Sequence, residues 1–171
     1  MVLSAERMSV IGVAGALSDA ICLLSETEER VLRELSRTLG VDWARLQSEL
    51  VFLRASAVDL AAVTALGDGP LCDDLRQGIR DRWRRLAGRS DVDFEGEIDE
   101  RTAPYGQVVS DPQKMSGSLR DAVGFVFSQC CTDGDPNADL AHLGGAMFAA
   151  LYDEVYQLLE AIDLAPTDTR A

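Results

Sequence analysis

Few residues of this chain have side chains that can act in catalysis near neutral pH. His142 is the only histidine and Lys114 the only lysine among 171 residues. On a helical wheel His142 lies beside Asp139 and Asp153 on the polar side, so we expect a surface histidine and not a general base. A Schiff-base lysine or a phosphate-binding loop would need Lys114, and no Gly-Lys-Ser/Thr loop is present. The sequence therefore favours a protein that is not an enzyme.

The cysteines have no spacing typical of a metal or redox site. Cys22, Cys72, Cys130 and Cys131 include no Cys-x-x-Cys pair, and no histidine lies near any of them. We expect buried, reduced thiols.

An acidic run at 91–99 resembles the first part of an EF-hand calcium loop, with Gly96 at the sixth position. Its candidate ligands are Asp91, Asp93, Glu95, Glu97 and Asp99. The twelfth position, normally a bidentate glutamate, is Thr102, and Pro104 follows where the next helix should continue. A solvated acidic loop without a cofactor is the expectation, and calcium is the alternative.

One carboxylate lies on an expected apolar helix face. Glu154 lies between Leu151 and Leu158 on the helical wheel, and a carboxylate buried there needs a partner. Arg54, at the edge of the apolar side of another helix, could supply it if the two helices are antiparallel. We therefore consider Glu154 and Arg54 a candidate buried polar pair.

A row of arginines precedes the acidic run. Arg76, Arg80 and Arg84 are spaced four residues apart, so they share one side of a helix. Such a row could bind an acidic partner or a phosphate. The six acids within 91–100 could equally neutralise it, in which case the row is structural.

Two long rows of apolar residues predict the main helices of the chain. One runs from Trp43 to Thr64 and the other from Leu140 to Ile162, each in steps of three or four residues. The 22 leucines and 21 alanines also favour helix over sheet. The sequence predicts an all-α, elongated helical bundle of about six helices, with long helices at about 42–66 and 136–163.

Local signals predict the other elements. Helices are expected at 3–24, 25–39, 71–87 and 112–131, with a short or kinked helix within 90–110 and no important strand. Capping residues are expected at Ser25, Asp42 and Asp111, and a helix end at Gly40. Residues 1–165 are predicted to form one domain and 166–171 a flexible tail.

The helix at 42–66 is apolar on most of its circumference. Phe52 and Val63 fall among the polar residues of its far side. Two interpretations follow: this helix is the centre of one chain, or Phe52 and Val63 belong to a dimer interface.

Charge limits the partners. The net charge of −13 and the pI near 4.4 argue against nucleic acid. We find neither a convincing signal peptide nor an apolar run near 18 residues, so we expect no membrane span and a cytoplasmic protein.

The main hypothesis is a non-enzymatic bundle acting through protein–protein association, as a homodimer or an adaptor. The alternative is a bundle that binds a small ligand or metal through Glu154 and Arg54 or through 91–99.

Overall fold

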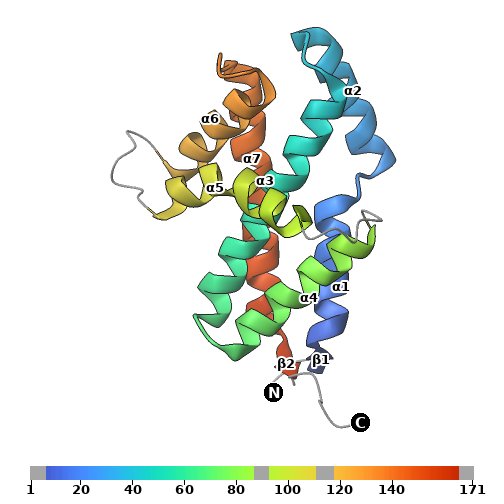
Figure 1. Ribbon diagram of the computed structural model, residues 1–171, viewed down its shortest axis with the longest axis vertical. Helices are drawn as coiled ribbons and strands as arrows, with labels where there is room; N and C mark the ends of the chain where they lie inside the picture. Colours follow the sequence, from blue (N-terminus) through green and yellow to red (C-terminus); the bar gives the residue numbers. More distant parts are fainter. Residues whose placement is uncertain (1–6, 87–92, 111–117, 166–171) are drawn as a thin grey trace, which may run out of the picture.

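The chain folds into an elongated bundle of helices (Figure 1). The computed structural model describes residues 7–86, 93–110 and 118–165. Within these ranges the helices are α1 (Val10–Cys22), α2 (Glu26–Leu39), α3 (Trp43–Leu66), α4 (Pro70–Leu86), α5 (Asp93–Ser110), α6 (Leu119–Cys131) and α7 (Ala138–Ala161). The prediction of an all-α bundle is confirmed, and α3 and α7 are the two long helices. The predicted tail at 166–171 and the predicted cap at Asp111 lie outside the described residues.

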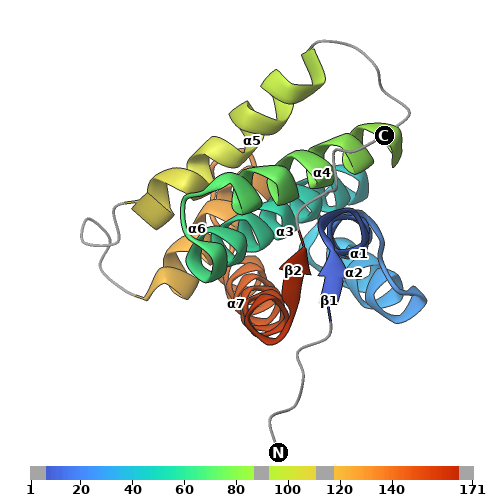
Figure 2. The same cartoon turned by 90° about the horizontal axis from the view of Figure 1, so that it is seen from below.

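Helix α3 lies at the centre of the bundle. It begins after Asp42, whose carboxylate accepts a hydrogen bond from the Arg45 N–H, and ends at Gly67, where φ is 70°. Figure 2 shows α7 on one side of α3 and α4 with α5 on the other, and α1 also contacts it. Its buried residues include Leu46, Leu50, Phe52, Leu53, Ala57, Val58 and Ala61. Because its neighbours cover most of its circumference, α3 is the central helix of one chain.

Helix α2 lies beside the N-terminal part of α3, at the opposite end of the molecule from the strands (Figure 1). The Ser25 hydroxyl accepts a hydrogen bond from the Glu28 N–H, and the Ser25 N–H donates to the Glu28 carboxylate. Gly40 ends the helix in the left-handed conformation, with φ of 67°. Both ends are as the sequence predicts.

Glycines allow α6 and α7 to pack closely. A Cβ atom on Gly124 would lie 2.0 Å from the Ala141 carbonyl oxygen, and one on Gly145 would lie 2.4 Å from the Arg120 carbonyl oxygen. No larger residue fits at either position without moving the backbone. The intrinsic helix cost of Gly124 is therefore offset by this close contact.

Two short strands correct the expectation that no strand matters. β1 (Arg7–Ser9) and β2 (Asp163–Ala165) are parallel, and Arg7 pairs with Asp163. The Ser9 hydroxyl accepts a hydrogen bond from the Gly12 N–H, which starts α1 at Val10 and not near residue 3. Apolar periodicity could not reveal this, because each strand is only three residues long and needs the other to form.

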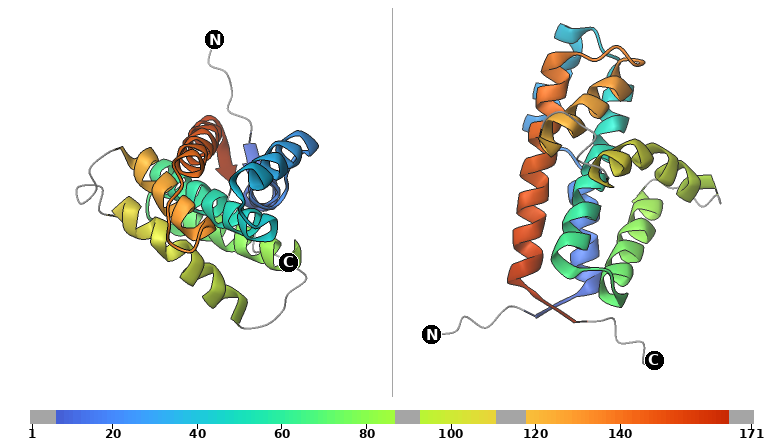
Figure 3. Two further views of the ribbon diagram at one scale, coloured as in Figure 1. Left: turned by 90° about the horizontal axis from the view of Figure 1, so that it is seen from above. Right: turned by 90° about the vertical axis from the view of Figure 1, so that its left-hand side faces the viewer.

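Helix α5 corrects the interpretation of 91–99 as a loop. It runs across the long axis of the bundle and includes Pro104 in its interior (Figure 3). Proline removes one backbone donor, so it weakens α5, but it does not end the helix. Helical geometry begins at Asp93, which is incompatible with a calcium-binding loop over 93–99. Asp91 lies outside the described residues.

One stretch is long and apolar enough to cross a membrane by length and composition alone. It spans Val10–Leu39 and has a mean hydropathy of 1.5 in its most apolar window. In the structure this stretch comprises two helices, α1 and α2, and α1 buries Val13, Leu17 and Ile21 against the bundle. A core helix passes the same test, so this is weak support for a membrane span.

Candidate ligand-binding site

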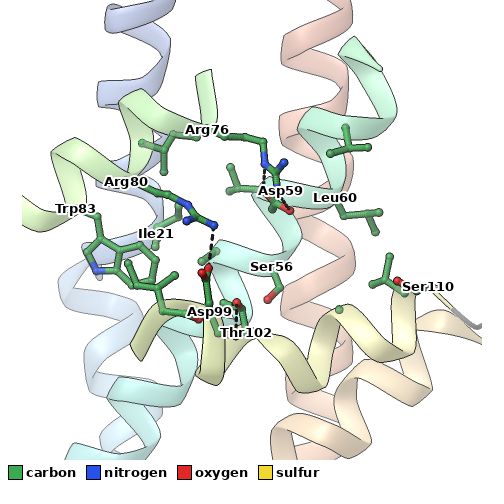
Figure 4. A pocket seen from close by; sticks show the side chains of 17 residues that line it. Ile21, Ser56, Asp59, Leu60, Arg76, Arg80, Trp83, Asp99, Thr102 and Ser110 are labelled. Atoms are coloured by element: carbon green, nitrogen blue, oxygen red, sulfur yellow. Dashed lines mark hydrogen bonds and ion pairs between the residues drawn. The ribbon is translucent and has the colours of Figure 1, made fainter. Parts of the chain in front are cut away.

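A pocket of about 370 Å³ lies between α3, α4 and α5 (Figure 4). Its volume falls in the range of about 300–1,000 Å³ that small-molecule sites occupy. Much of its wall is apolar: Ile21, Val58, Leu60, Val63, Ile79, Trp83, Ile98 and Val109 contribute to it. Such a wall suits the apolar part of a ligand, which gains free energy by leaving water.

Two arginine–aspartate pairs lie at this pocket. Arg76 donates from Nε to Asp59 Oδ1 at 2.5 Å and from Nη2 to Asp59 Oδ2 at 3.0 Å. One helical turn later, Arg80 Nη2 donates to Asp99 Oδ1 at 3.0 Å. The hydrogen bonds with Asp59 raise the pKa of the Arg76 guanidinium above its ordinary value. Figure 4 shows the four side chains converging on one side of the pocket.

Three hydroxyl groups also line the pocket, on Ser56, Thr102 and Ser110, and the first two already donate their protons to backbone carbonyls. Ser56 donates to the Phe52 carbonyl at 2.9 Å, and Thr102 donates to the Ile98 carbonyl at 2.8 Å. Each acceptor is the carbonyl one turn earlier in the same helix. The Ser56 and Thr102 hydroxyls can therefore accept hydrogen bonds from a ligand but are poor donors.

Helix α5, which forms one wall, is held against α3 by an ion pair between a partly exposed arginine and a buried glutamate. Arg101 pairs with Glu49, a buried carboxylate on α3, and its guanidinium lies 4.9 Å from the centre of the Phe52 ring. The Phe52 ring centre is in turn 5.8 Å from that of Trp83. The Tyr105 side chain is fully buried. These contacts determine the position of the residues that α5 contributes to the pocket.

A second, smaller pocket of about 320 Å³ is lined by Arg45, Ser48, Glu49, Arg101 and Cys130. Cys130 is its only residue with a potentially nucleophilic thiol. Burial raises the pKa of this thiol, although Arg101 and Arg45 act in the opposite direction. Cys130 is therefore a protonated thiol near neutral pH, which does not suit nucleophilic catalysis.

The structure does not bring Glu154 and Arg54 together, so the predicted pair is wrong. Arg54 is buried as expected, but its Nη2 donates to Glu28 Oε1 at 2.6 Å. Its Nη1 donates to the carbonyls of Leu23 at 2.9 Å and Ala20 at 3.2 Å. Glu154 is exposed. The burial of Arg54 on α3 could be predicted from the sequence. Its partner could not, because that depends on how the turn between α1 and α2 is arranged.

The exposure of Glu154 follows from the orientation of α7. Of the predicted inward row, Leu140, Gly144 and Val155 are buried, but Phe148 and Leu159 are buried where Met147 and Leu158 were expected. Leu158 is exposed. The inward face thus includes Phe148 and Leu159 and leaves Glu154 exposed to solvent.

The two interface candidates, Phe52 and Val63, lie inside the chain. Phe52 is 7% exposed and contacts Trp83. Val63 is half-buried and lines the pocket between α3, α4 and α5. The apolar far side of α3 is therefore covered by α4 and α5.

Of the five calcium-ligand candidates, the structure describes the side chains of Glu97 and Asp99 alone. Among the residues that the structure describes, no group of three or more acidic, cysteine or histidine side chains could hold an ion. Glu97 and Asp99 are exposed positions on α5. Asp99 instead pairs with Arg80.

The arginine row has intramolecular partners. Arg76 pairs with Asp59, Arg80 with Asp99, and Arg84 Nη1 lies 3.5 Å from Asp81 Oδ1. The structural interpretation of the row is therefore supported, and Arg80 uses an acid, Asp99, from the 91–100 run.

Sequence reasoning missed the pocket itself. Nothing in the sequence indicated that Asp59 and Trp83 face one cavity. Gly106, on α5, also lines it. The missing information is the position of α5, because its proline and acidic start obscure the helical pattern.

Comparisons with known proteins give no relative. No protein-family model, curated protein or solved structure matches this chain.

Proposed function

We propose that this protein is a non-enzymatic helical bundle that binds a small, largely apolar molecule in the pocket between α3, α4 and α5. The observation that carries the proposal is an apolar cavity of about 370 Å³ with charged side chains gathered on one side. Most small-molecule sites combine an apolar wall with a few polar groups that orient the ligand.

This proposal adopts the ligand-binding alternative in place of association. The association hypothesis relied on apolar surface of α3 or α7 being free to contact another chain, with Phe52 and Val63 of α3 as the named candidates. Phe52, its main candidate, is buried, and Val63 faces the pocket. With these residues used inside one chain, a homodimer or adaptor function has less support than ligand binding.

The fluorescence of Trp83 can report ligand binding in the pocket. This residue lines the pocket, and the chain has only one other tryptophan, Trp43, which is not among the lining residues. In a Trp43→Phe background, titration with 1-octanol should therefore change Trp83 emission in a saturable manner, because the ligand replaces water near the indole.

Two variants block the pocket. Gly106 lines it, and a Cβ atom there would meet nothing within 4 Å, so Gly106→Phe should fill the cavity without steric conflict. Gly15→Phe is the matched control, since Gly15 is also an open helical position and does not line the pocket. Ser56→Leu fills the cavity from α3.

The proposal requires weaker octanol binding in Gly106→Phe and Ser56→Leu, and unchanged binding in Gly15→Phe. Circular dichroism verifies that each variant is helical. Equal binding by all four proteins, or no saturable signal in the parent, would show that the pocket is not a binding site.

A further inference from the structure

The two ion pairs at the pocket differ in how many N–H donors of the arginine they use. Asp59 binds Arg76 through two hydrogen bonds, one to each carboxylate oxygen. Asp99 binds Arg80 through one, and the structure gives Arg80 no other partner among the described residues. A guanidinium has five N–H donors, so Arg80 retains donors for another acceptor.

The carboxylate of Asp99 is also the easier one to displace. Its side chain is 61% exposed, against 48% for Asp59, while the Arg80 side chain is 33% exposed. An exposed carboxylate that leaves its arginine is hydrated at little cost, and an exposed ion pair contributes little free energy. Arg80 is therefore the cation of this pocket that a ligand can recruit.

Besides the two ion pairs, the polar lining of the pocket includes three hydroxyl groups, on Ser56, Thr102 and Ser110. Ser56 and Thr102 have their protons committed to backbone carbonyls. Figure 4 shows the Arg80 guanidinium turned toward the pocket, with Leu60 and Ser110 on the opposite side. Val63 and Val109 add to the apolar lining. A ligand that matches this arrangement has an apolar body and one acceptor group that binds a guanidinium.

We infer that the ligand of this pocket is an amphipathic anion, with an apolar body among α3 and α5 and a single acidic head bound by Arg80. This inference rests on the proposed function and specifies its ligand class. An anionic head gains charge-assisted hydrogen bonds from Arg80, while Asp99 turns to water. A cationic head would face Arg76 and Arg80 together, and its contact with the exposed Asp99 would be screened by solvent.

A head-group series tests the inference. Octanoate, 1-octanol and octylamine share one apolar chain and carry an anionic, a neutral and a cationic head, and each is titrated against Trp83 emission in the Trp43→Phe background. We expect octanoate to bind about tenfold more tightly than 1-octanol, and octylamine no more tightly than 1-octanol.

Opposite effects are expected from the two halves of one ion pair. Arg80→Gln should remove the preference for octanoate, a loss of about tenfold, and leave 1-octanol binding unchanged. Asp99→Asn should tighten octanoate binding about threefold, because it removes the competing carboxylate. A merely structural pair would weaken all three probes in both variants.

Arg82→Gln is the matched control. Arg82 lies on the same helix and pairs with Asp19 at 3.3 Å, but it does not line the pocket. Its head-group preference should equal that of the parent.

The outcomes separate this inference from the proposed function. Saturable binding of all three probes with equal affinity, a preference for octylamine, or a preference for octanoate that survives Arg80→Gln would overturn the anion assignment while the pocket remains a binding site. The absence of binding by every probe would overturn both.

Discussion

Arg54 Nη2 lies 2.6 Å from Glu28 Oε1, and the same guanidinium donates to the carbonyls of Leu23 and Ala20. One buried side chain of α3 thus satisfies carbonyls at the end of α1 and pairs with the capping-box glutamate that starts α2. The turn between α1 and α2 is therefore held by a residue from a third helix, and several predictions about stability depend on it.

Arg54→Met should lower the free energy of unfolding by about 2 kcal/mol, because two partly buried carbonyls and Glu28 lose their donor. Chemical denaturation measures this change. Arg37→Met is the control, since Arg37 and Glu34 form an ion pair at 3.5 Å with both side chains largely exposed, and its effect should stay within about 0.5 kcal/mol. Equal losses in both variants would contradict the role of Arg54.

Glu28 makes part of this stability dependent on pH. The hydrogen bond from the Ser25 backbone lowers the pKa of Glu28 below its ordinary value near 4.5, and Arg54 lowers it further. A carboxyl group whose pKa is lowered by folding stabilises the folded state above its unfolded pKa, and this contribution disappears as pH falls through the folded pKa. Glu28→Gln should therefore reduce stability at neutral pH and flatten its decline below about pH 4.5. Parallel pH profiles for the two proteins would refute this assignment.

Gly124→Ala should destabilise the protein by about 2–3 kcal/mol, because the added methyl group would lie 2.0 Å from the Ala141 carbonyl oxygen. Gly15→Ala is the control on another helix. A Cβ there meets nothing within 4 Å, so it should stabilise the protein by about 0.5–1 kcal/mol. Thermal unfolding monitored by circular dichroism compares the two, and a gain in stability at Gly124 would mean that α6 and α7 are farther apart than described.

Phe52→Glu distinguishes a core residue from an interface residue. Phe52 is 7% exposed and contacts Trp83, so a carboxylate there should cost at least about 3 kcal/mol of unfolding free energy. Its effect should appear in denaturation curves and not as a change in mass by sedimentation. A stable variant that only changes its association state would restore the interface interpretation.

The elements with strong local signals were predictable from the sequence. Ser25 with Glu28, Gly40 and Asp42 define helix ends through chemistry within a few residues, and α3 has a regular apolar row. These features need no knowledge of distant contacts, which explains why the predicted bounds of α2 and α3 are confirmed.

The features that depend on tertiary packing were not predictable. On α7, Phe148 and Leu159 are buried where the predicted row has Met147 and Leu158, and Glu154, expected on the apolar side, is exposed. Helix α5 contains Pro104, so its continuity depends on contacts such as the one between Arg101 and Glu49. The pocket exists because α5 crosses α3 and α4, and one sequence contains no local signal for that crossing.

The pairing of β1 with β2 has a consequence for the order of folding. Arg7 and Asp163 come together although nearly the whole described chain separates them, so this contact closes a very long loop. Contacts of such large sequence separation form after the local helices and their hairpins, because their entropic cost is only repaid once the intervening helices are packed. The strand pair should thus be the final step of folding, and a spectroscopic label at this end of the molecule would report when folding is complete.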